Sequence, residues 1–255
     1  MDDSDRRDPP IKATQTSLRI LEALRSHGPA GVSELAGEVG LPVSTVHDHL
    51  VTLTRASYVV SEDDEYRIGM RFLTLGGHAR DEMTVFNIAE PQVKKLARDT
   101  GEHANLMVEE HGMGFFLCIA TGSDALKLDT HAGMRTYLHT TALGKSILAT
   151  LPSSRYEQIL EERGLPRFTG QTVTSRAALD EELDRIRDRG YATDTGERIT
   201  GVRCVAAPVV GDDGVLGAVS VSAPESRIRD EEMAAELPRR VQRAANVIEV
   251  NATHA

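Results

Sequence analysis

The sequence predicts an α+β protein that consists of an N-terminal winged helix-turn-helix, a linker helix and a C-terminal α+β domain. Three short helical patterns lie within residues 16–56, and a hairpin pattern follows them directly. From Phe86 onward, helical and strand patterns alternate and include a long antiparallel hairpin, which is typical of an α+β domain. The chain has 255 residues, whereas a single core stops growing at about 250, so two domains are expected.

The first two helices are bounded by capping residues. One helix is expected over 16–28, where leucines recur on one face and a glycine ends the pattern. A second is expected over 32–40, with Ser33 as its N-cap and Gly40 as its stop. Because a glycine-containing turn of three or four residues joins it to the next helix, the pattern predicts a helix-turn-helix.

The third helix is expected to begin at Pro42, because proline is favourable in the first helical turn. Two β-rich runs around a polar turn at 58–68 predict a hairpin, which completes a winged helix-turn-helix. A connecting helix is expected over 71–83, although Gly76 and Gly77 lower its stability by about 1 kcal/mol each. Either this helix is simply weak, or a second helix packs closely against the two glycines.

The C-terminal part alternates between helices and strands. Helices are expected at about 87–100, 139–152, 153–163, 175–189 and 230–252, and strands or hairpins at 103–121, 191–195 and 201–223. The first hairpin is expected to turn at His111-Gly112, and the last has an Asp-Gly turn.

The composition limits what the chain can be. It contains no run of about 18 apolar residues, so no membrane span is expected. Residues 1–11 are charged and lack the apolar segment of a signal peptide, so they are expected to form a disordered tail. A cytoplasmic protein is therefore expected, with its two cysteines, Cys118 and Cys204, as free thiols.

The charge is acidic, with a net value of -10. Residues 14–60 hold three arginines against four carboxylates, which is unusual for a protein that binds nucleic acid. Only 5 of the 29 basic residues are lysines. An acidic, lysine-poor surface stays soluble by self-repulsion and suits a salty cytoplasm, but a GC-rich genome gives the same arginine bias, and both explanations stay open.

The stretch GLPVSTVHDHLVTL, residues 40–53, predicts a helix with an apolar face and a polar face that carries hydroxyl groups and Asp48. Its position after a helix-turn and before a hairpin favours DNA reading over an ordinary amphipathic helix. The candidate DNA-binding residues are Lys12, Ser33, Ser44, Thr45, His47, Asp48, Thr52 and Arg55. His47 and His49 are two residues apart and point to different sides of the helix, so they do not readily share a metal ion.

The stretch ALGKS, residues 142–146, resembles the end of a phosphate-binding loop. That motif requires a glycine where His139 stands, which excludes nucleotide hydrolysis. The start of this helix offers unpaired amide N–H groups near Thr141, Ala142 and Leu143, and such groups attract anions together with the helix dipole. Thr140 or Thr141 can also cap the helix, and the two roles are compatible.

Polar groups lie on the inward faces of the last hairpin. Strand alternation places Cys204 on one face with Ala206, and Ser220 on one face with Ser222. A thiol and two serines are unusual in an apolar core, so ligand lining and simple packing are both open. No histidine lies near Cys204 in the sequence, so a nucleophilic role is not favoured.

The whole chain resembles the IclR family of transcriptional regulators. The matching stretches are GVSELAGEVGLPVSTVHDHLVTL, LHTTALGKSILA, GLPRFT, IRDRGYATD and GVRCVAAPV, which occur in family order over residues 12 to about 250. The resemblance implies a winged helix-turn-helix at 12–70, a dimerising linker helix at 71–85 and a GAF-like effector domain at 86–255. It also implies that a small molecule, often an organic acid, tunes DNA binding.

The resemblance further implies a ligand pocket. Similar proteins build it from the positions that match Ala142, Leu143, Asp194, Cys204, Ser220 and Ser222, and the free helix start adds Thr141. Asp194 suits a hydroxyl or a protonated ligand group better than a bare carboxylate. No arginine can be placed in this pocket from the sequence, so modest, micromolar or weaker binding is expected, because neutral donors contribute less than charged ones.

Two acidic features are unfavourable for DNA binding. Asp48 stands where the family usually has a basic residue; an aspartate is repelled by phosphate but can accept a hydrogen bond from cytosine N4. The turn at 61–65 is acidic, and a wing tip near phosphates would be repelled unless salt screens the charges.

The expected protein is a one-component transcriptional regulator, a homodimer or a dimer of dimers, that binds a palindromic operator in double-stranded DNA. It is expected to sense a small organic acid and to need no cofactor, no metal and no catalytic residue. The alternative is a small-molecule sensor or enzyme-like protein whose winged helix mediates protein interaction.

Overall fold

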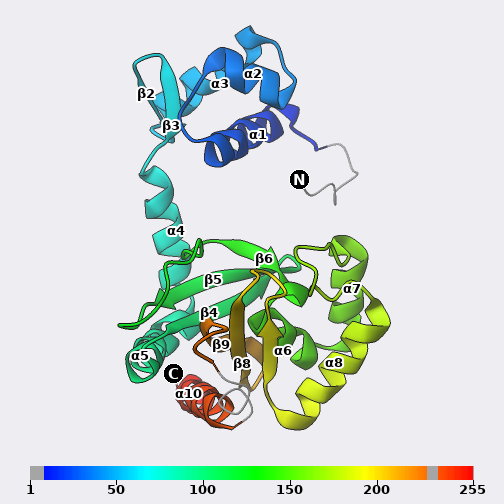
Figure 1. Ribbon diagram of the computed structural model, residues 1–255. Coiled ribbons are helices and arrows are strands. Elements are labelled where there is room, and N and C mark those ends of the chain that lie inside the picture. The colour runs from blue at the N-terminus through cyan, green and yellow to red at the C-terminus, as the bar shows by residue number, and fades with distance from the viewer. Residues whose placement is uncertain (1–8, 229–234, 255) are drawn as a thin grey trace. The chain divides into compact units, whose positions relative to one another are not determined.

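The computed structural model describes residues 9–228 and 235–254, which form two compact units, one ending at Ala79 and one beginning at Arg80 (Figure 1). Most of the expected N-terminal tail, and residues 230–234 of the expected last helix, lie outside the described residues. Within the described ranges, no helix is both long enough and apolar enough to cross a membrane.

The N-terminal unit is a winged helix-turn-helix. Its elements are α1 (Lys12–His27), β1 (Ala30–Gly31), α2 (Val32–Val39), α3 (Val43–Arg55), β2 (Val59–Glu62) and β3 (Glu65–Ile68). The strands form an antiparallel sheet in the order β1-β3-β2, so the short β1, which the sequence did not reveal, joins the expected hairpin. Ile20, Leu35 and Leu50, one from each helix, are fully buried in the shared core, and burying such side chains stabilises the unit by about 1.5–3 kcal/mol each.

Three helix starts differ from the expectation. α1 begins at Lys12, about one turn early. Ser33 is not the N-cap of α2, because the extended backbone of β1 continues to Gly31, which takes the capping position. Pro42 is also extended, with ψ 141°, so it is the N-cap of α3 rather than its first helical residue.

The wing turns at Asp63 and Asp64, which have φ values of 50° and 65°. Two consecutive left-handed residues are the geometry of a two-residue hairpin turn, and aspartate tolerates this region better than most residues. Glu62 and Glu65 flank the turn, and all four side chains are exposed. The wing tip is therefore an exposed acidic surface, as the sequence indicated.

The linker helix α4 (Arg71–Asp81) ends two residues earlier than expected and contains no buried residue. Phe72 packs against Tyr58 with ring centroids 5.0 Å apart, so Phe72 belongs to the N-terminal unit. Gly76 and Gly77 have no atom within 4 Å of the position that a Cβ would take. Close packing against these glycines is thus absent within the described chain, and the helix keeps an open surface.

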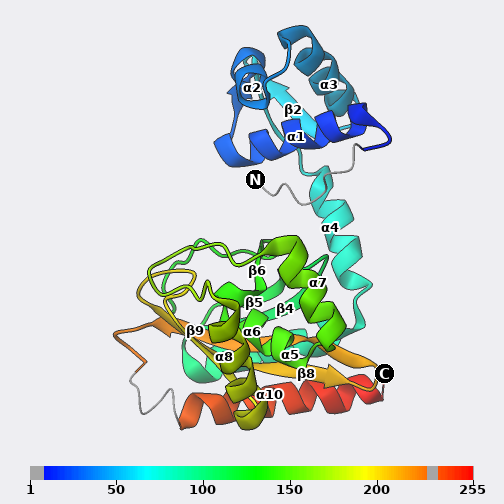
Figure 2. The same ribbon diagram turned by 90° about the vertical axis from the view of Figure 1, so that its right-hand side faces the viewer.

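The C-terminal unit has three layers. Its elements are α5 (Thr84–Thr100), β4 (His103–Glu110), β5 (Met113–Ala120), β6 (Arg135–Tyr137), a 3-10 turn η1 (Leu138–Thr140), α6 (Ala142–Thr150), α7 (Ser153–Arg163), α8 (Arg176–Arg189), β7 (Ala192–Thr195), β8 (Val202–Gly211), β9 (Gly214–Pro224) and α10 (Glu236–Thr253). The six strands pair antiparallel in the order β6-β5-β4-β9-β8-β7. α5 and α10 cover one face of the sheet and α6, α7 and α8 the other (Figure 2).

The two long hairpins of this sheet turn differently. The β4–β5 turn is at His111-Gly112, as expected, with φ values of 52° and 75°. The β8–β9 turn is at Asp212-Asp213 rather than at an Asp-Gly pair. The reason is the register of the ladder, because Gly214 pairs with Gly211 and is therefore already part of β9.

We expect the open surface of α4 to hold a second copy of the chain. Met70, Leu73 and Leu75 are 75%, 70% and 51% exposed beside the two glycines, and covering them would remove apolar surface from water. Replacing both Gly76 and Gly77 with leucine should block close approach and weaken the dimer at least tenfold in sedimentation measurements. Gly37→Leu on α2, where the added side chain also meets open space, is the control. An unchanged dimer constant in the double variant would contradict this interface.

Candidate functional site

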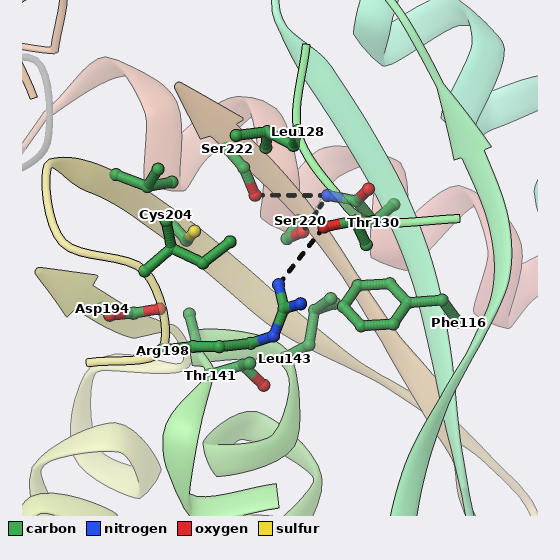
Figure 3. A pocket seen from close by; sticks show the side chains of 14 residues that line it. Phe116, Leu128, Thr130, Thr141, Leu143, Asp194, Arg198, Cys204, Ser220 and Ser222 are labelled. Carbon is green, nitrogen blue, oxygen red and sulfur yellow. Dashed lines mark hydrogen bonds between the residues drawn. The ribbon is translucent and has the colours of Figure 1, made fainter. Parts of the chain in front are cut away.

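A pocket lies between the start of α6, the inner face of the sheet and the loops before β6 and β8 (Figure 3). Its cavity volume is about 40 Å³, and part of the pocket is open to solvent. All seven residues proposed from the sequence line it: Thr141, Ala142, Leu143, Asp194, Cys204, Ser220 and Ser222. The fold brings together a helix start and three strands that lie far apart in the sequence.

The β8–β9 ladder sets the floor of the pocket. Cys204 pairs with Ser222, and Asn105 of β4 pairs with Ser220, so these side chains share one face of the sheet. Asn105 Nδ2 donates to Ser220 Oγ at 3.1 Å and to Ser222 Oγ at 3.2 Å. Asn105 thus fixes both serines, and sequence reasoning missed it because β4 lies more than 100 residues away.

The start of α6 forms one wall of the pocket. Thr141 is the N-cap, and its Oγ1 accepts a hydrogen bond from Gly144 N at 3.0 Å. No described residue accepts from the amides of Ala142 and Leu143, which lie at the pocket. A side-chain cap and free backbone N–H groups therefore occur together at the start of this helix.

Arg198 corrects the expectation that no arginine reaches the pocket. It comes from the loop between β7 and β8, and its side chain is only 15% exposed. Its Nη1 donates to Thr130 Oγ1 at 3.2 Å (Figure 3). Its Nη2 lies 3.4 Å from Asp129 Oδ1. No sequence pattern indicated it, because an irregular loop has no periodicity that assigns a side chain to a face.

Asp194 is buried at the edge of the same pocket. Its Oδ1 accepts a hydrogen bond from Glu197 N at 2.7 Å. Burial raises the pKa of Asp194 to about 6, although Lys145 and that hydrogen bond oppose the rise. The pocket therefore contains a carboxyl group that changes protonation close to neutral pH.

Cys204 has the environment of a lining residue. Burial, together with the nearby Asp194 carboxyl, raises the pKa of the Cys204 thiol. A protonated thiol is a poor nucleophile. Among the described residues, no cluster of three or more His, Cys, Asp or Glu side chains is arranged to hold a metal ion.

The exposed face of α3 is the second candidate site. Ser44, Asp48, Thr52 and Arg55 lie along one exposed stripe at spacings of four, four and three. Asp48 is 85% exposed in the middle of the stripe. Thr52 Oγ1 donates to Asp48 O at 2.8 Å, so its proton is used within the helix.

The other predicted DNA-binding residues lie apart from this stripe. His47 is exposed and Thr45 half-buried on α3, whereas Lys12 and Ser33 are exposed on α1 and α2. His49 packs inward instead, with its Nδ1 2.8 Å from Ser17 Oγ of α1. That contact ties two helices together and leaves His47 without a second imidazole beside it.

A helix-turn-helix unit followed by an antiparallel α+β unit with a small-molecule pocket defines a one-component transcriptional regulator. Residues 14–63 match the family described as IclR helix-turn-helix domain, and residues 77–250 match the one described as Bacterial transcriptional regulator IclR C-terminal. The chain belongs to the IclR family. It is therefore a DNA-binding transcriptional regulator with a C-terminal effector domain, and not an enzyme.

Similar proteins cover nearly the whole chain. It is 34% identical to the "Probable HTH-type transcriptional regulator ArcR" of Halobacterium salinarum, over 94% of this chain and 93% of that protein. It is also 34% identical to the regulator BhcR of Paracoccus denitrificans, over 88% and 82% of the two chains.

Solved structures show the same fold. The IclR structure from Thermotoga maritima has a TM-score of 0.77 at 26% identity, over 95% of this chain and 99% of that one. An IclR homolog from Microbacterium hydrocarbonoxydans, solved with 4-hydroxybenzoate, has a TM-score of 0.80 at 22% identity, over 95% and 100% of the two chains.

The raised pKa of Asp194 predicts a pH-dependent stability. The folded state holds a proton that the unfolded state has already released, so this stabilisation is complete below the unfolded pKa of 3.8 and is lost as the pH rises through about 6. Asp194→Asn keeps the acceptor for Glu197 N and cannot ionise, so the variant does not lose this stability as the pH rises. The melting temperature of the variant relative to the wild type should therefore rise between pH 5 and pH 8, with at most about 3 kcal/mol involved for one group.

Thermal unfolding at several pH values is the measurement. Asp184→Asn, at a 74% exposed carboxylate, is the control and should follow the wild type throughout. A constant difference between Asp194→Asn and the wild type from pH 5 to pH 8 would show that Asp194 is ionised over that whole range.

Proposed function

We propose that the chain is a homodimeric regulator that binds a palindromic operator in double-stranded DNA and responds to a small organic acid held in the pocket. The observation that carries the ligand class is the convergence of Arg198 with the free amides of Ala142 and Leu143 on one cavity. A guanidinium and a helix start both favour an anion. Neutral serine hydroxyls on the floor can donate to its remaining oxygens.

The same pocket favours a second, uncharged polar group on the ligand. Asp194 can accept a hydrogen bond from a hydroxyl, whereas it would repel another carboxylate. Phe116 adds an apolar surface for the body of the ligand. These features support a hydroxy acid. The relative solved with 4-hydroxybenzoate holds a ligand with both groups, which supports the same class here.

Arg198 changes the expected strength of binding. The expectation of weak binding depended on neutral donors alone, whereas a hydrogen bond from a charged donor contributes about 1.5–3 kcal/mol. Arg198 already contacts Thr130 and Asp129, so a bound acid competes with these two contacts. We therefore expect the acid to bind more tightly than neutral donors alone would allow. The loss of the Thr130 and Asp129 contacts reduces this gain in affinity.

On the DNA side, the proposal assigns base reading to the exposed stripe of α3. Residues 12–70 form the DNA-binding domain in this proposal, 71–85 the linker and 86–255 the effector domain. Hydroxyl groups and Arg55 supply the donors, and Lys12 and Ser33 supply contacts from the other helices. For the acid to control DNA binding, it must bind the DNA-competent and DNA-incompetent states unequally, since equal affinity shifts nothing.

Replacing Arg198 with methionine should weaken binding of an organic acid by about tenfold or more, because one charge-assisted bond is lost. Calorimetry of the full chain against a panel of aliphatic and aromatic acids, 4-hydroxybenzoate included, is the measurement. Ser222→Ala should weaken binding less and leave DNA binding without ligand unchanged. Arg185→Met, at an exposed arginine of α8, is the matched control. No heat with any acid for the wild-type chain would contradict the proposed ligand class.

Replacing Asp48 with alanine should change base preference rather than reduce affinity. Removing a carboxylate from the DNA-facing stripe relieves phosphate repulsion, so binding to nonspecific DNA should stay equal or rise. Discrimination at one base pair should fall by about 1–3 kcal/mol, the value of a good base contact. Selection from a randomised site, with Glu22→Ala on α1 as control, measures this. The same selected sequence for Asp48→Ala and wild type would show that Asp48 does not contact a base.

A further inference from the structure

Lys145, in the second turn of α6, is fully buried. Its Nζ donates to Glu182 Oε1 of α8 at 2.6 Å and to Glu197 Oε1 at 2.5 Å. Lysine is almost never fully buried unless it is paired, and here it has two carboxylate partners from different parts of the chain. Lys145 does not line the pocket, so the binding site described above leaves this buried cation without a role.

One of the two partners is directly connected to the pocket. Glu197 precedes Arg198 in the chain, and its backbone N donates to Asp194 Oδ1. Arg198 and Asp194 both line the pocket, whereas Glu197 points away from it to Lys145. Among the described residues, Asp194 and Arg198 are the only charged side chains that line this cavity, and both belong to one short segment. The Glu197 carboxylate therefore anchors this segment on the side away from the cavity.

Threonines fix the backbone of the same segment. Thr169 Oγ1 donates to Gly196 O at 2.8 Å, and Thr172 Oγ1 donates to Glu197 O at 2.7 Å. These bonds hold the main chain but not the direction of the Glu197 side chain. Only Lys145 does that among the described residues, because Glu197 Oε2 is buried without a hydrogen-bonding partner.

A purely stabilising role does not explain this arrangement well. Replacing a buried ion pair by apolar residues of similar volume is often neutral or even stabilising, because desolvating the charges offsets their attraction. Removing one partner alone leaves a buried charge that must protonate or move toward water. In the case of Glu197, such movement displaces Arg198.

We propose that Lys145 is a positioning residue for the effector pocket: through Glu197 it holds Arg198 toward the cavity and so sets the preference for an anionic over a neutral ligand. The proposal rests on the proposed function, since it concerns the ligand of the same pocket. Lys145 acts without touching the ligand. Lys145 Nζ holds the Glu197 carboxylate, and Glu197 is followed in the chain by Arg198.

The two carboxylates on Lys145 provide a matched pair of variants. Glu197→Met and Glu182→Met each remove one negative charge and one acceptor from the same Nζ, but only Glu197 adjoins the pocket segment. The full chain is titrated with 4-hydroxybenzoate and with the uncharged 4-hydroxybenzamide, and the ratio of the two dissociation constants is compared. Glu197→Met and Lys145→Met should lower the preference for the acid at least fivefold, and Glu182→Met should keep it within twofold of wild type.

A conservative variant separates position from charge. Glu197→Gln keeps an acceptor for Lys145 Nζ without the charge, so the preference for the acid should be largely retained. Equal losses in Glu197→Met and Glu182→Met, or the same loss in Glu197→Gln as in Glu197→Met, would overturn the positioning role in favour of a general electrostatic effect.

Hydrogen exchange of the ligand-free chain gives a second readout. Amides 195–201 should exchange faster in Glu197→Met but not in Glu182→Met. If the wild-type chain binds neither probe, the proposed ligand class fails, while the exchange comparison still decides whether Lys145 positions this segment. Unchanged exchange in Glu197→Met would overturn the inference whatever the probes do.

Discussion

The effector unit depends on one buried ionic contact, that of Lys145 with Glu182 and Glu197. It joins α6, α8 and the loop before β8, and Arg187 of α8 adds a second polar link by donating to Ala149 O of α6 at 2.8 Å. Burial alone would lower the pKa of Lys145, but the two carboxylates raise it, so the ammonium stays charged. Because burying these charges is costly, the contact requires all three segments to be in place together. In the inference above, the same contact fixes the position of the pocket segment that carries Arg198.

The charges that face the pocket oppose each other. Arg198 favours an anion, and Asp194 disfavours one unless it is protonated or meets a hydroxyl. Burial raises the pKa of Asp194 to about 6 and that of Glu197 to about 7, so small shifts in pH or in bound charge alter the protonation of this group of residues. The hydroxy acid proposed as the ligand presents its carboxylate to Arg198 and its hydroxyl to Asp194.

The DNA-binding unit carries little positive charge, although its partner, DNA, is a polyanion. Asp48 occupies the middle of the exposed stripe of α3, and four carboxylates form the wing tip. Phosphate contacts normally supply most of the affinity for DNA, so this unit gains less from them than a basic one. Salt screens such repulsion over about 8–10 Å at ordinary ionic strength. The proposed recognition by α3 therefore relies on hydroxyl and base contacts more than on phosphate contacts.

The sequence by itself determined the order of most elements, because periodicity, capping signals and strand alternation are local properties. The family and most of the candidate pocket residues were predicted from the resemblance of whole stretches of the sequence to the IclR family. It did not determine the cap of α2, where β1 extends the backbone to Gly31, or the turn of the last hairpin, where cross-strand register decides. Asn105, Arg198 and the partners of Lys145 depended on the tertiary structure. Each reaches its place from a distant strand or an irregular loop, and a contact between residues far apart in the chain leaves no pattern in either segment alone.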